Sequence, residues 1–288
     1  ICKARNDALS RATRDVVALL DDDELVAADA LSWVARTIQT HPFANLIYSD
    51  EDKIDEDGNR KEPHFKPSFN IDLLLSYNFI SHLGVYRKAL LDEIEGFRPG
   101  FEGSQDHDLA LRVILESSPD QIVHIPRVLY HWRTHPESTA SNPNSKDYTT
   151  ERGLKAVQHY LDIQCQRGGT KAIASRQAAN RFRCAWQLPE NEPSVDLIIP
   201  TRDKADILEL AVRSILEKTN YSNYVITIVD NGSTEEKTKQ LFDSLIDGYP
   251  SKIKILPYHH EFNYSAINNF AAKQSKADII GLVNNDVE

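Results

Sequence analysis

Apolar and polar positions in the second part of the chain alternate between two periodicities. Four apolar runs of buried-strand length, at 195–199, 225–229, 253–256 and 279–283, are separated by stretches whose apolar residues recur at helical spacing. These stretches predict a helix that buries Leu208, Ala211, Val212 and Ile215, a second that buries Leu241, Phe242 and Leu245, and a short third at 266–272. Because crossovers between such strands are right-handed, we expect an α/β fold with a mostly parallel sheet whose strand carboxyl ends share one edge.

The first part of the chain is less regular. A helix is predicted with Leu31, Val34, Ala35 and Ile38 on its buried face, and a hairpin turn at Asp57-Gly58. Ser104 is the expected N-cap of a following helix. Strands are predicted at 122–125 and 128–130, a helix at 150–161 that buries Leu154, Val157 and Leu161, and an edge strand at 181–186.

The two ends of the chain repeat one element. A helix and an apolar strand that runs into Asp21-Asp22-Asp23 recur as a helix and a strand that run into Asn284-Asn285-Asp286, and 286 − 23 = 263. A period of 263 is far longer than a solenoid repeat, so we interpret the chain as a fragment of tandem domains cut out of phase. We expect the later part of a first domain at 1–141, a helical tail and linker at 142–193, and the early part of a second domain at 194–288.

Composition and charge exclude several classes. A net charge of −10 argues against nucleic acid as a partner, since phosphate backbones require a basic surface. Three cysteines without a paired spacing predict neither a disulfide framework nor a zinc site. No apolar run reaches the length of a membrane span. The chain contains no Met and begins with Ile1, which favours a fragment over a complete translation product.

Polar clusters follow three of the predicted parallel strands. They are Thr201-Arg202-Asp203, Asp230-Asn231-Gly232-Ser233 and Asn284-Asn285-Asp286, and they meet at the edge where open α/β sheets bind ligands. Taken singly, the middle cluster can also be read as a turn with Ser233 as a helix N-cap. Neither a GxGxxG fingerprint nor a P-loop is present, so a carboxylate-bound Mg²⁺ or Mn²⁺ is the expected link to a diphosphate.

Four segments in order resemble the donor-binding half of family-2 glycosyltransferases with the GT-A fold. They are Ile198–Asp203, Ile228–Thr234, Phe262–Asn269 and Leu282–Asp286. The resemblance implies that Thr201, Asp203 and Asp230 contact the nucleoside, and that Asp286 belongs to a DxD-type metal site. This copy reads Asn-Asn-Asp, so its first ligand is a carboxamide.

The front of the chain resembles the complementary half of the same fold. The resemblance implies that Asp21 and Asp23 bind the metal and that Asp106 is the general base, with Gln105 in place of the family's Glu. The alternative for Asp106 is a charge that favours a helix N-terminus. Further candidates are Asp50 and Asp52 near the donor sugar or metal, or in a solvated acidic hairpin, and Arg133 with His131 or His135 near the diphosphate.

The resemblance implies an inverting glycosyltransferase that uses a nucleotide-diphosphate sugar and extends a polysaccharide of the cell envelope, or a lipid-linked glycan, in the cytoplasm or at the inner face of the membrane. Two alternatives remain open at this point. A nucleotidyltransferase would need a Gly-rich basic loop after its first strand, where this chain has Pro200-Thr201-Arg202-Asp203. A silent carbohydrate-binding or scaffold domain is compatible with Asn284 and Asn285.

Strand pairing provides one further expectation. In the resembled fold, the strand before the metal motif lies between the two halves of the sheet. We therefore expect 279–283 to pair with 195–199 because their connection is short, and 16–20 to lack its neighbour on one side. An apolar strand with an open edge is a liability.

Overall fold

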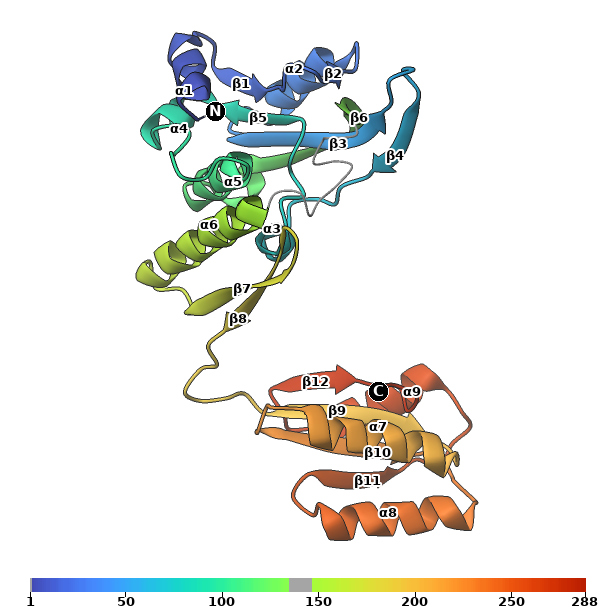
Figure 1. The fold of residues 1–288 in the computed structure, drawn as a ribbon. Coiled ribbons are helices and arrows are strands. Elements are labelled where there is room, and N and C mark those ends of the chain that lie inside the picture. The colour runs from blue at the N-terminus through green and yellow to red at the C-terminus, as the bar shows by residue number, and fades with distance from the viewer. Residues whose placement is uncertain (1, 135–146) are drawn as a thin grey trace. The chain divides into compact units, whose positions relative to one another are not determined.

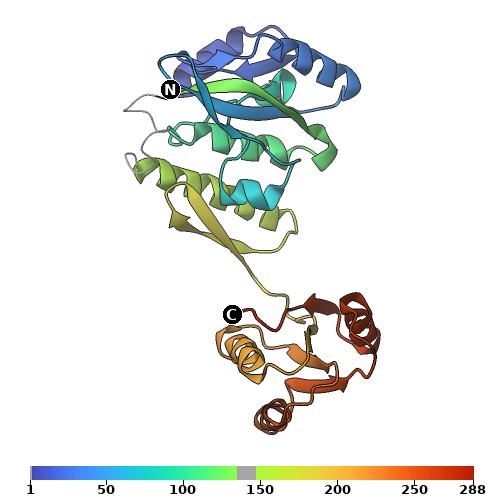
Figure 2. The ribbon, with the colours of Figure 1, turned by 90° about the vertical axis from the view of Figure 1, so that its right-hand side faces the viewer.

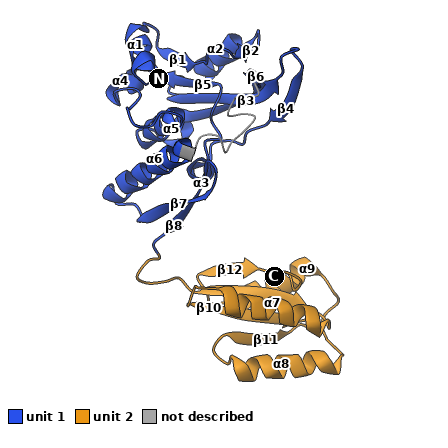
Figure 3. Cartoon of the chain, viewed as in Figure 1, with its two compact units in different colours: residues 1–187 blue, residues 188–288 orange. Residues whose placement is uncertain are grey.

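The computed structural model describes residues 2–134 and 147–288, and the chain divides into two compact units (Figure 3). Unit 1 is Ile1–Gln187 and unit 2 is Leu188–Glu288. The division falls near the end of the helical tail and linker predicted at 142–193. Of the helices in the described residues, none is both long and apolar enough to cross a membrane.

Unit 1 is built around one six-stranded mixed sheet, in the order β1-β5-β3-β6-β2, with β4 paired to β3 (Figure 1). β3 and β6 are parallel, whereas the other pairs are antiparallel. A separate hairpin is formed by β7 and β8. The elements are α1 (Cys2–Arg11), β1 (Val16–Leu19), β2 (Leu25–Val26), α2 (Ala30–Thr40), β3 (Leu46–Ile54), β4 (Arg60–His64), α3 (Ile71–Ser76), β5 (Gly84–Arg87), α4 (Lys88–Glu93), α5 (Gln105–Leu115), the 3-10 helix η1 (Pro119–Gln121), β6 (Ile122–Arg133), α6 (Asp147–Gln166), β7 (Ala172–Ala178) and β8 (Arg181–Trp186).

The two faces of this sheet carry different cores. Leu46 and Tyr48 of β3 point to a core that includes residues of α3, α5 and α6. Ile47, between them, points to the opposite core with Val34 of α2. Figures 1 and 2 show helices on both sides of the strands. This alternation follows from the two-residue period of a strand.

Unit 2 confirms the predicted alternation of strands and helices. Its four strands lie in the order β11-β10-β9-β12, and all three pairings are parallel. Ile199 packs in the core that contains α7 and α8, while Ile198 packs in the core that contains α9. The elements are β9 (Val195–Thr201), α7 (Ala205–Lys218), β10 (Tyr224–Asp230), α8 (Glu236–Gly248), β11 (Ile253–Pro257), α9 (Tyr264–Gln274) and β12 (Ile279–Leu282).

Several local predictions need correction. On α2, Val34 is buried and Ile38 packs against the core as predicted, but Leu31 is 75% exposed and Ala35 is exposed. The helix turns Ala30 to the core in their place. Ser104 is the N-cap residue of α5, as expected, but its side chain does not cap the helix, since its hydroxyl donates to the Thr149 carbonyl at 2.7 Å. The strands predicted at 122–125 and 128–130 form one continuous strand, β6. The hairpin turn at Asp57-Gly58 is confirmed, with Gly58 at a φ of 84° between β3 and β4.

The repeated element has the same form at both ends of the chain. β12 begins and ends 263 residues after β1, and each strand follows a helix, α9 or α1. β12 pairs with β9, as expected, and β1 pairs with β5. Each strand is at the end of its sheet, so within the described residues each has one unpaired edge.

Candidate functional site

The turn between β1 and β2 carries the first predicted metal ligands. The Asp21 backbone N–H donates to the Tyr130 hydroxyl at 3.4 Å, and its carboxylate is paired with Arg5 of α1. Arg133, at the end of β6, donates from Nε to the Asp23 carbonyl at 2.9 Å. The structure thus places Arg133 against the main chain of the turn that carries Asp21 and Asp23.

Negative charge accumulates at this turn. Burial raises the pKa of Glu24 to about 7, and the charges of Asp23 and Asp21 act in the same direction. No group of three His, Cys, Asp or Glu side chains suited to a metal ion occurs in residues 2–134 and 147–288. Mg²⁺ is commonly held by one or two carboxylates together with substrate phosphates, and the oxygen donors of this turn fit that kind of site.

Asp106 lies in the first turn of α5 and is half-buried. Asn78, in the loop between α3 and β5, donates from Nδ2 to an Asp106 carboxylate oxygen at 2.9 Å. The neighbouring Gln105 side chain instead accepts from the Gly103 backbone N–H. Gln105 is therefore occupied by its own turn, whereas Asp106 is oriented by a separate element.

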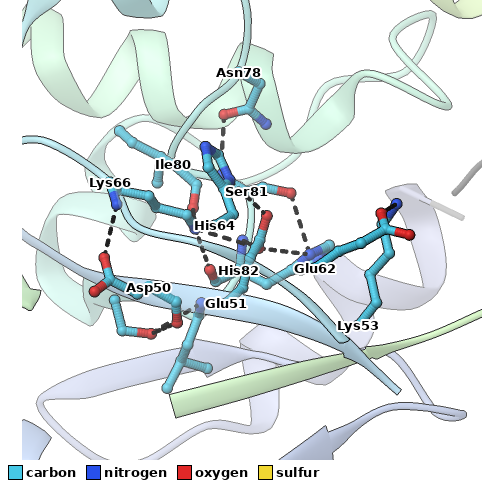
Figure 4. Close-up of polar contacts among 12 residues, drawn as sticks. Asp50, Glu51, Lys53, Glu62, His64, Lys66, Asn78, Ile80, Ser81 and His82 are labelled. Carbon is cyan, nitrogen blue, oxygen red and sulfur yellow. Dashed lines mark hydrogen bonds and ion pairs between the residues drawn. The ribbon is translucent and has the colours of Figure 1, made fainter. Parts of the chain in front are cut away.

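A five-residue loop, Asn78–His82, connects the predicted base to the predicted metal turn. Asn78 Oδ1 accepts from the Ser81 N–H at 3.2 Å, and the Ser81 hydroxyl lies 3.1 Å from His82 Nδ1. His82 Nε2 is 3.7 Å from an Asp21 carboxylate oxygen, and the imidazole stacks on Tyr130 at 4.6 Å. Figure 4 shows the loop above the polar stretch of β3. One chain of contacts therefore joins Asp106 to Asp21.

A buried ion pair lies beneath the loop. The Lys66 ammonium, whose side chain is fully buried, is 3.2 Å from Glu51 of β3 and also donates to the carbonyls of Ile80 and His82 (Figure 4). Burial raises the pKa of Glu51, but hydrogen bonds from His64 and Lys66 and the Lys66 charge outweigh it, so the pKa is lowered. Burial lowers the pKa of Lys66. The charge of Glu51 and the hydrogen bond to it act in the opposite direction, and an ammonium has three hydrogens for the three acceptors.

The other acidic candidates of β3 are engaged inside the protein. Asp50 accepts from His124 Nε2 at 2.7 Å and from the Lys66 backbone N–H at 2.9 Å. Asp52 lies 2.6 Å from both His131 Nδ1 and Arg60 Nε. Both carboxylates are buried, which favours a structural role for them and for His131. His135 lies outside the described residues.

Unit 2 has a cavity of about 380 Å³ at the carboxyl end of its sheet. Thr201 and Asp286, predicted to bind nucleotide and metal, both line it. Asn284 accepts from the Tyr264 hydroxyl at 3.2 Å, and Asn285 donates to the Thr201 hydroxyl at 3.3 Å. The cavity also includes Arg202, Phe262 and Tyr264, to which the sequence analysis gave no role. The sequence analysis had placed Arg202 in the polar cluster after the first strand, and Phe262 and Tyr264 in the segment Phe262–Asn269 that resembles the family.

Asp203 and Asp230 have different surroundings and do not line the cavity. Asp203 accepts from the backbone N–H groups of Glu235 and Thr234, at 2.9 and 2.8 Å, and these bonds lower its pKa. Asp230 accepts from the Ser233 N–H at 2.8 Å. Both acids therefore shape the loop before α8, whose N-cap is Glu235 rather than Ser233.

Comparison with known proteins gives a consistent set of relatives. The model of "Glycosyl transferase family 2" matches residues 1–95 and 196–288. "Uncharacterized protein y4gI" of Sinorhizobium fredii is 43% identical over 286 residues, 99% of this chain and 31% of that protein. "O-antigen biosynthesis protein RfbC" of Myxococcus xanthus is 35% identical over 286 residues, 99% of this chain and 22% of that protein. The chain thus spans about a third or less of these relatives.

A search of solved structures finds S. aureus TarS, residues 1–349, in complex with UDP-GlcNAc. It has a TM-score of 0.43 and 17% identity, and the alignment covers 56% of this chain and 46% of the TarS 1–349 chain. Asp106 and Arg133 lie outside the residues matched by the family model, so the match does not test the roles predicted for them.

Proposed function

Because the chain belongs to glycosyl transferase family 2, we propose that it is part of an enzyme that transfers a sugar, with inversion, from a nucleotide-diphosphate donor to a growing glycan. The observation that carries this proposal is the contact chain from Asp106 through Asn78, Ser81 and His82 to Asp21. It connects a carboxylate suited to proton removal with a carboxylate turn suited to a diphosphate.

The proposed reaction divides the work between these groups. The acceptor hydroxyl attacks the anomeric carbon, its proton passes to an Asp106 carboxylate oxygen, and the bond to the diphosphate oxygen breaks. Asp21 and Asp23 would hold Mn²⁺ or Mg²⁺, which when bound neutralises charge on the leaving diphosphate. Arg133, fixed to this turn through the Asp23 carbonyl, adds positive charge on the same side.

For unit 2 we propose a nucleotide-binding role. The cavity that contains Thr201 and Asp286 is the expected place for the nucleoside diphosphate, and its polar and aromatic lining supports this. Asp203 and Asp230 would then act through the loop that they hold, or contact the nucleoside once that loop adjusts.

We further propose that the two units are complementary halves of successive domains. β12 has an unpaired edge at the end of its sheet, whereas β1, its equivalent in the repeat, pairs with β5. Ile279, Ile280 and Leu282 of β12 are 39–56% exposed, as expected for a strand that another part of the sheet covers. The chain spans 31% and 22% of its curated relatives, which leaves room for the missing halves.

The test is transfer by the full-length protein. Purified protein is incubated with Mn²⁺, an oligosaccharide acceptor and UDP- or GDP-sugars, and the product is analysed by NMR. Inversion predicts that the new linkage has the opposite anomeric configuration to the donor. Retention of configuration would exclude the inverting mechanism, and nucleotide binding without transfer from any donor would favour the scaffold alternative.

A further inference from the structure

Lys66 and Glu51 have no place in the chemistry proposed above, yet both contact the loop that connects its two reacting sides. We propose that this buried pair is a positioning device that fixes the Asn78–His82 loop and so sets the placement of Asp106 relative to Asp21. The inference rests on the proposed sugar transfer and assigns to it two residues that touch neither substrate nor metal.

Lys66 holds the loop through its main chain. Its ammonium donates to the carbonyls of Ile80 at 2.7 Å and of His82, two residues further on. The third donor faces Glu51, so every hydrogen of the ammonium is used. Because the side chain has no exposed surface, water cannot replace these donors without opening the fold.

Glu51, on β3, binds the same loop from the side of the sheet. One of its carboxylate oxygens accepts from the His82 backbone N–H at 3.2 Å and lies 3.2 Å from Lys66 Nζ. His82 is therefore held at both its N–H and its carbonyl by the two members of one ion pair. The His64 ring lies 3.3 Å from the other Glu51 oxygen, which fixes the carboxylate plane (Figure 4).

The two ends of the pinned loop reach the two reacting sides. Asn78 contacts Asp106, and the His82 imidazole faces Asp21 while it stacks on Tyr130. Small displacements matter at such a site, since a misplacement of about 1 Å can cost about 100-fold in rate. A loop held at its main chain by a buried pair meets this requirement better than one held by exposed side chains.

A buried ion pair is rarely the most stable way to fill a space, because well-packed apolar residues of the same volume are often as stabilising. Here an apolar pair would leave the carbonyls of Ile80 and His82 without their donor. The geometry therefore points to order in the loop, rather than global stability, as the contribution of Lys66 and Glu51.

The experiment compares paired substitutions in the full-length protein. Lys66→Met with Glu51→Gln removes both buried charges together, so neither is left unpaired. The matched control is Lys53→Met with Glu62→Gln, an ion pair of 2.6 Å between β3 and β4 whose members are partly exposed (Figure 4). We expect the first double variant to lower kcat about 10- to 100-fold with donor KM within about twofold, and the control to retain both. Wild-type kcat in the first variant overturns the proposal, and so does an equal loss in the control.

Two further measurements distinguish a positioning role of the buried pair from a folding defect, and test that role independently of the proposed activity. Asn78→Ala removes the link to Asp106 without burying a charge, so it should lower kcat even if the Lys66 variant fails to fold. The fold-loss in kcat caused by Asn78→Ala should be smaller in the Lys66→Met, Glu51→Gln background than in the wild type. If the two fold-losses simply multiply, Asn78 and the buried pair act independently and the proposal is contradicted. Amide exchange of the His82 N–H, which needs no activity, should accelerate in that background but not in the control. Unchanged exchange overturns the proposal even if the protein transfers no sugar.

Discussion

The Asn78 side chain donates a hydrogen bond of 2.9 Å to Asp106, whereas Asp108, in the same turn of α5, is bound by two arginines. Arg112 Nε lies 3.0 Å and Arg98 Nε 3.2 Å from one Asp108 oxygen, and the Asp108 side chain is 1% exposed. Two acids two residues apart therefore differ in their surroundings: Asp106 is half-buried and bound by a carboxamide, whereas Asp108 is a buried anion held by arginines.

For Asp106 we expect loss of chemistry with retention of binding. Asp106→Asn in the full-length protein should lower kcat about 100-fold or more, because a positioned general base contributes about that much. Donor affinity, measured by titration of the nucleotide sugar, should be nearly unchanged. The control is Asp120→Asn on an exposed turn of unit 1. Normal turnover by Asp106→Asn would remove the base assignment.

For Asp108 the expected loss is in stability. Asp108→Ala leaves Arg98 and Arg112 without their carboxylate, and breaking a buried ion pair on one side costs about 3–5 kcal/mol. Denaturant unfolding of the full-length protein should show a lower midpoint for unit 1. Asp106→Asn, compared side by side, should shift that midpoint much less. Equal shifts would mean that the two acids are not separated as described.

For the metal turn we expect a contrast between adjacent aspartates. EDTA should abolish transfer, and Asp23→Ala should weaken binding of a nucleoside diphosphate in the presence of Mn²⁺. Asp22→Ala is the matched control, because Asp22 is an exposed acid of the same turn to which no metal role is assigned. Calorimetric titration of each variant with the nucleoside diphosphate, with and without Mn²⁺, measures the binding. If neither EDTA nor Asp23→Ala changes nucleotide binding, the aspartate turn binds no metal and is only a charged loop.

The second copy of this turn gives a gain-of-function prediction. Asn284 is equivalent to Asp21, since 284 − 263 = 21, and it lines the unit 2 cavity with Asp286. Asn284→Asp should raise Mn²⁺ affinity in the presence of nucleoside diphosphate by on the order of tenfold, because a carboxylate binds hard cations better than a carboxamide. Asn285→Asp is the control at the intervening position. No gain at position 284 would argue against metal binding by unit 2.

His107 predicts a pH dependence of stability. Burial lowers the pKa of His107, and its Nε2 lies 2.8 Å from the Leu74 carbonyl, which requires a proton on that nitrogen. Since the unfolded chain binds the second proton more readily, this contribution is complete above about pH 6.5 and is lost as the pH falls from there toward the lower folded pKa. The slope is at most about 1.4 kcal/mol per pH unit.

His107→Gln keeps a donor for the Leu74 carbonyl and should flatten the decline in melting temperature between about pH 6.5 and pH 5. His41→Gln, at an exposed histidine after α2, should leave the decline unchanged. A wild-type slope in His107→Gln would assign the acid sensitivity to other groups.

The apolar periodicity alone determined much of the architecture. The alternation of runs and helical faces in unit 2, including Leu208, Val212 and Phe242, is confirmed because each residue's place in a strand or helix is a local property. The four motifs in their order also identified the family, which the family model confirms. Where local periodicity was ambiguous, as for Leu31 in α2, packing against the sheet decided the buried face.

The site itself divides in the same way. Sequence motifs pointed to Asp21, Asp23, Asp106 and Thr201, because these acids and hydroxyls follow strands or open helices in recognisable order. Only the tertiary structure showed that Asp50 and Asp52 are bound by histidines and that Asp203 binds the loop before α8. The contact of Lys66 with the main chain of the Asn78–His82 loop was likewise visible only in the structure. The residues in these contacts are between 14 positions apart, for Lys66 and Ile80, and 79 positions apart, for Asp52 and His131. No local sequence pattern encodes which distant partner a buried charge will contact.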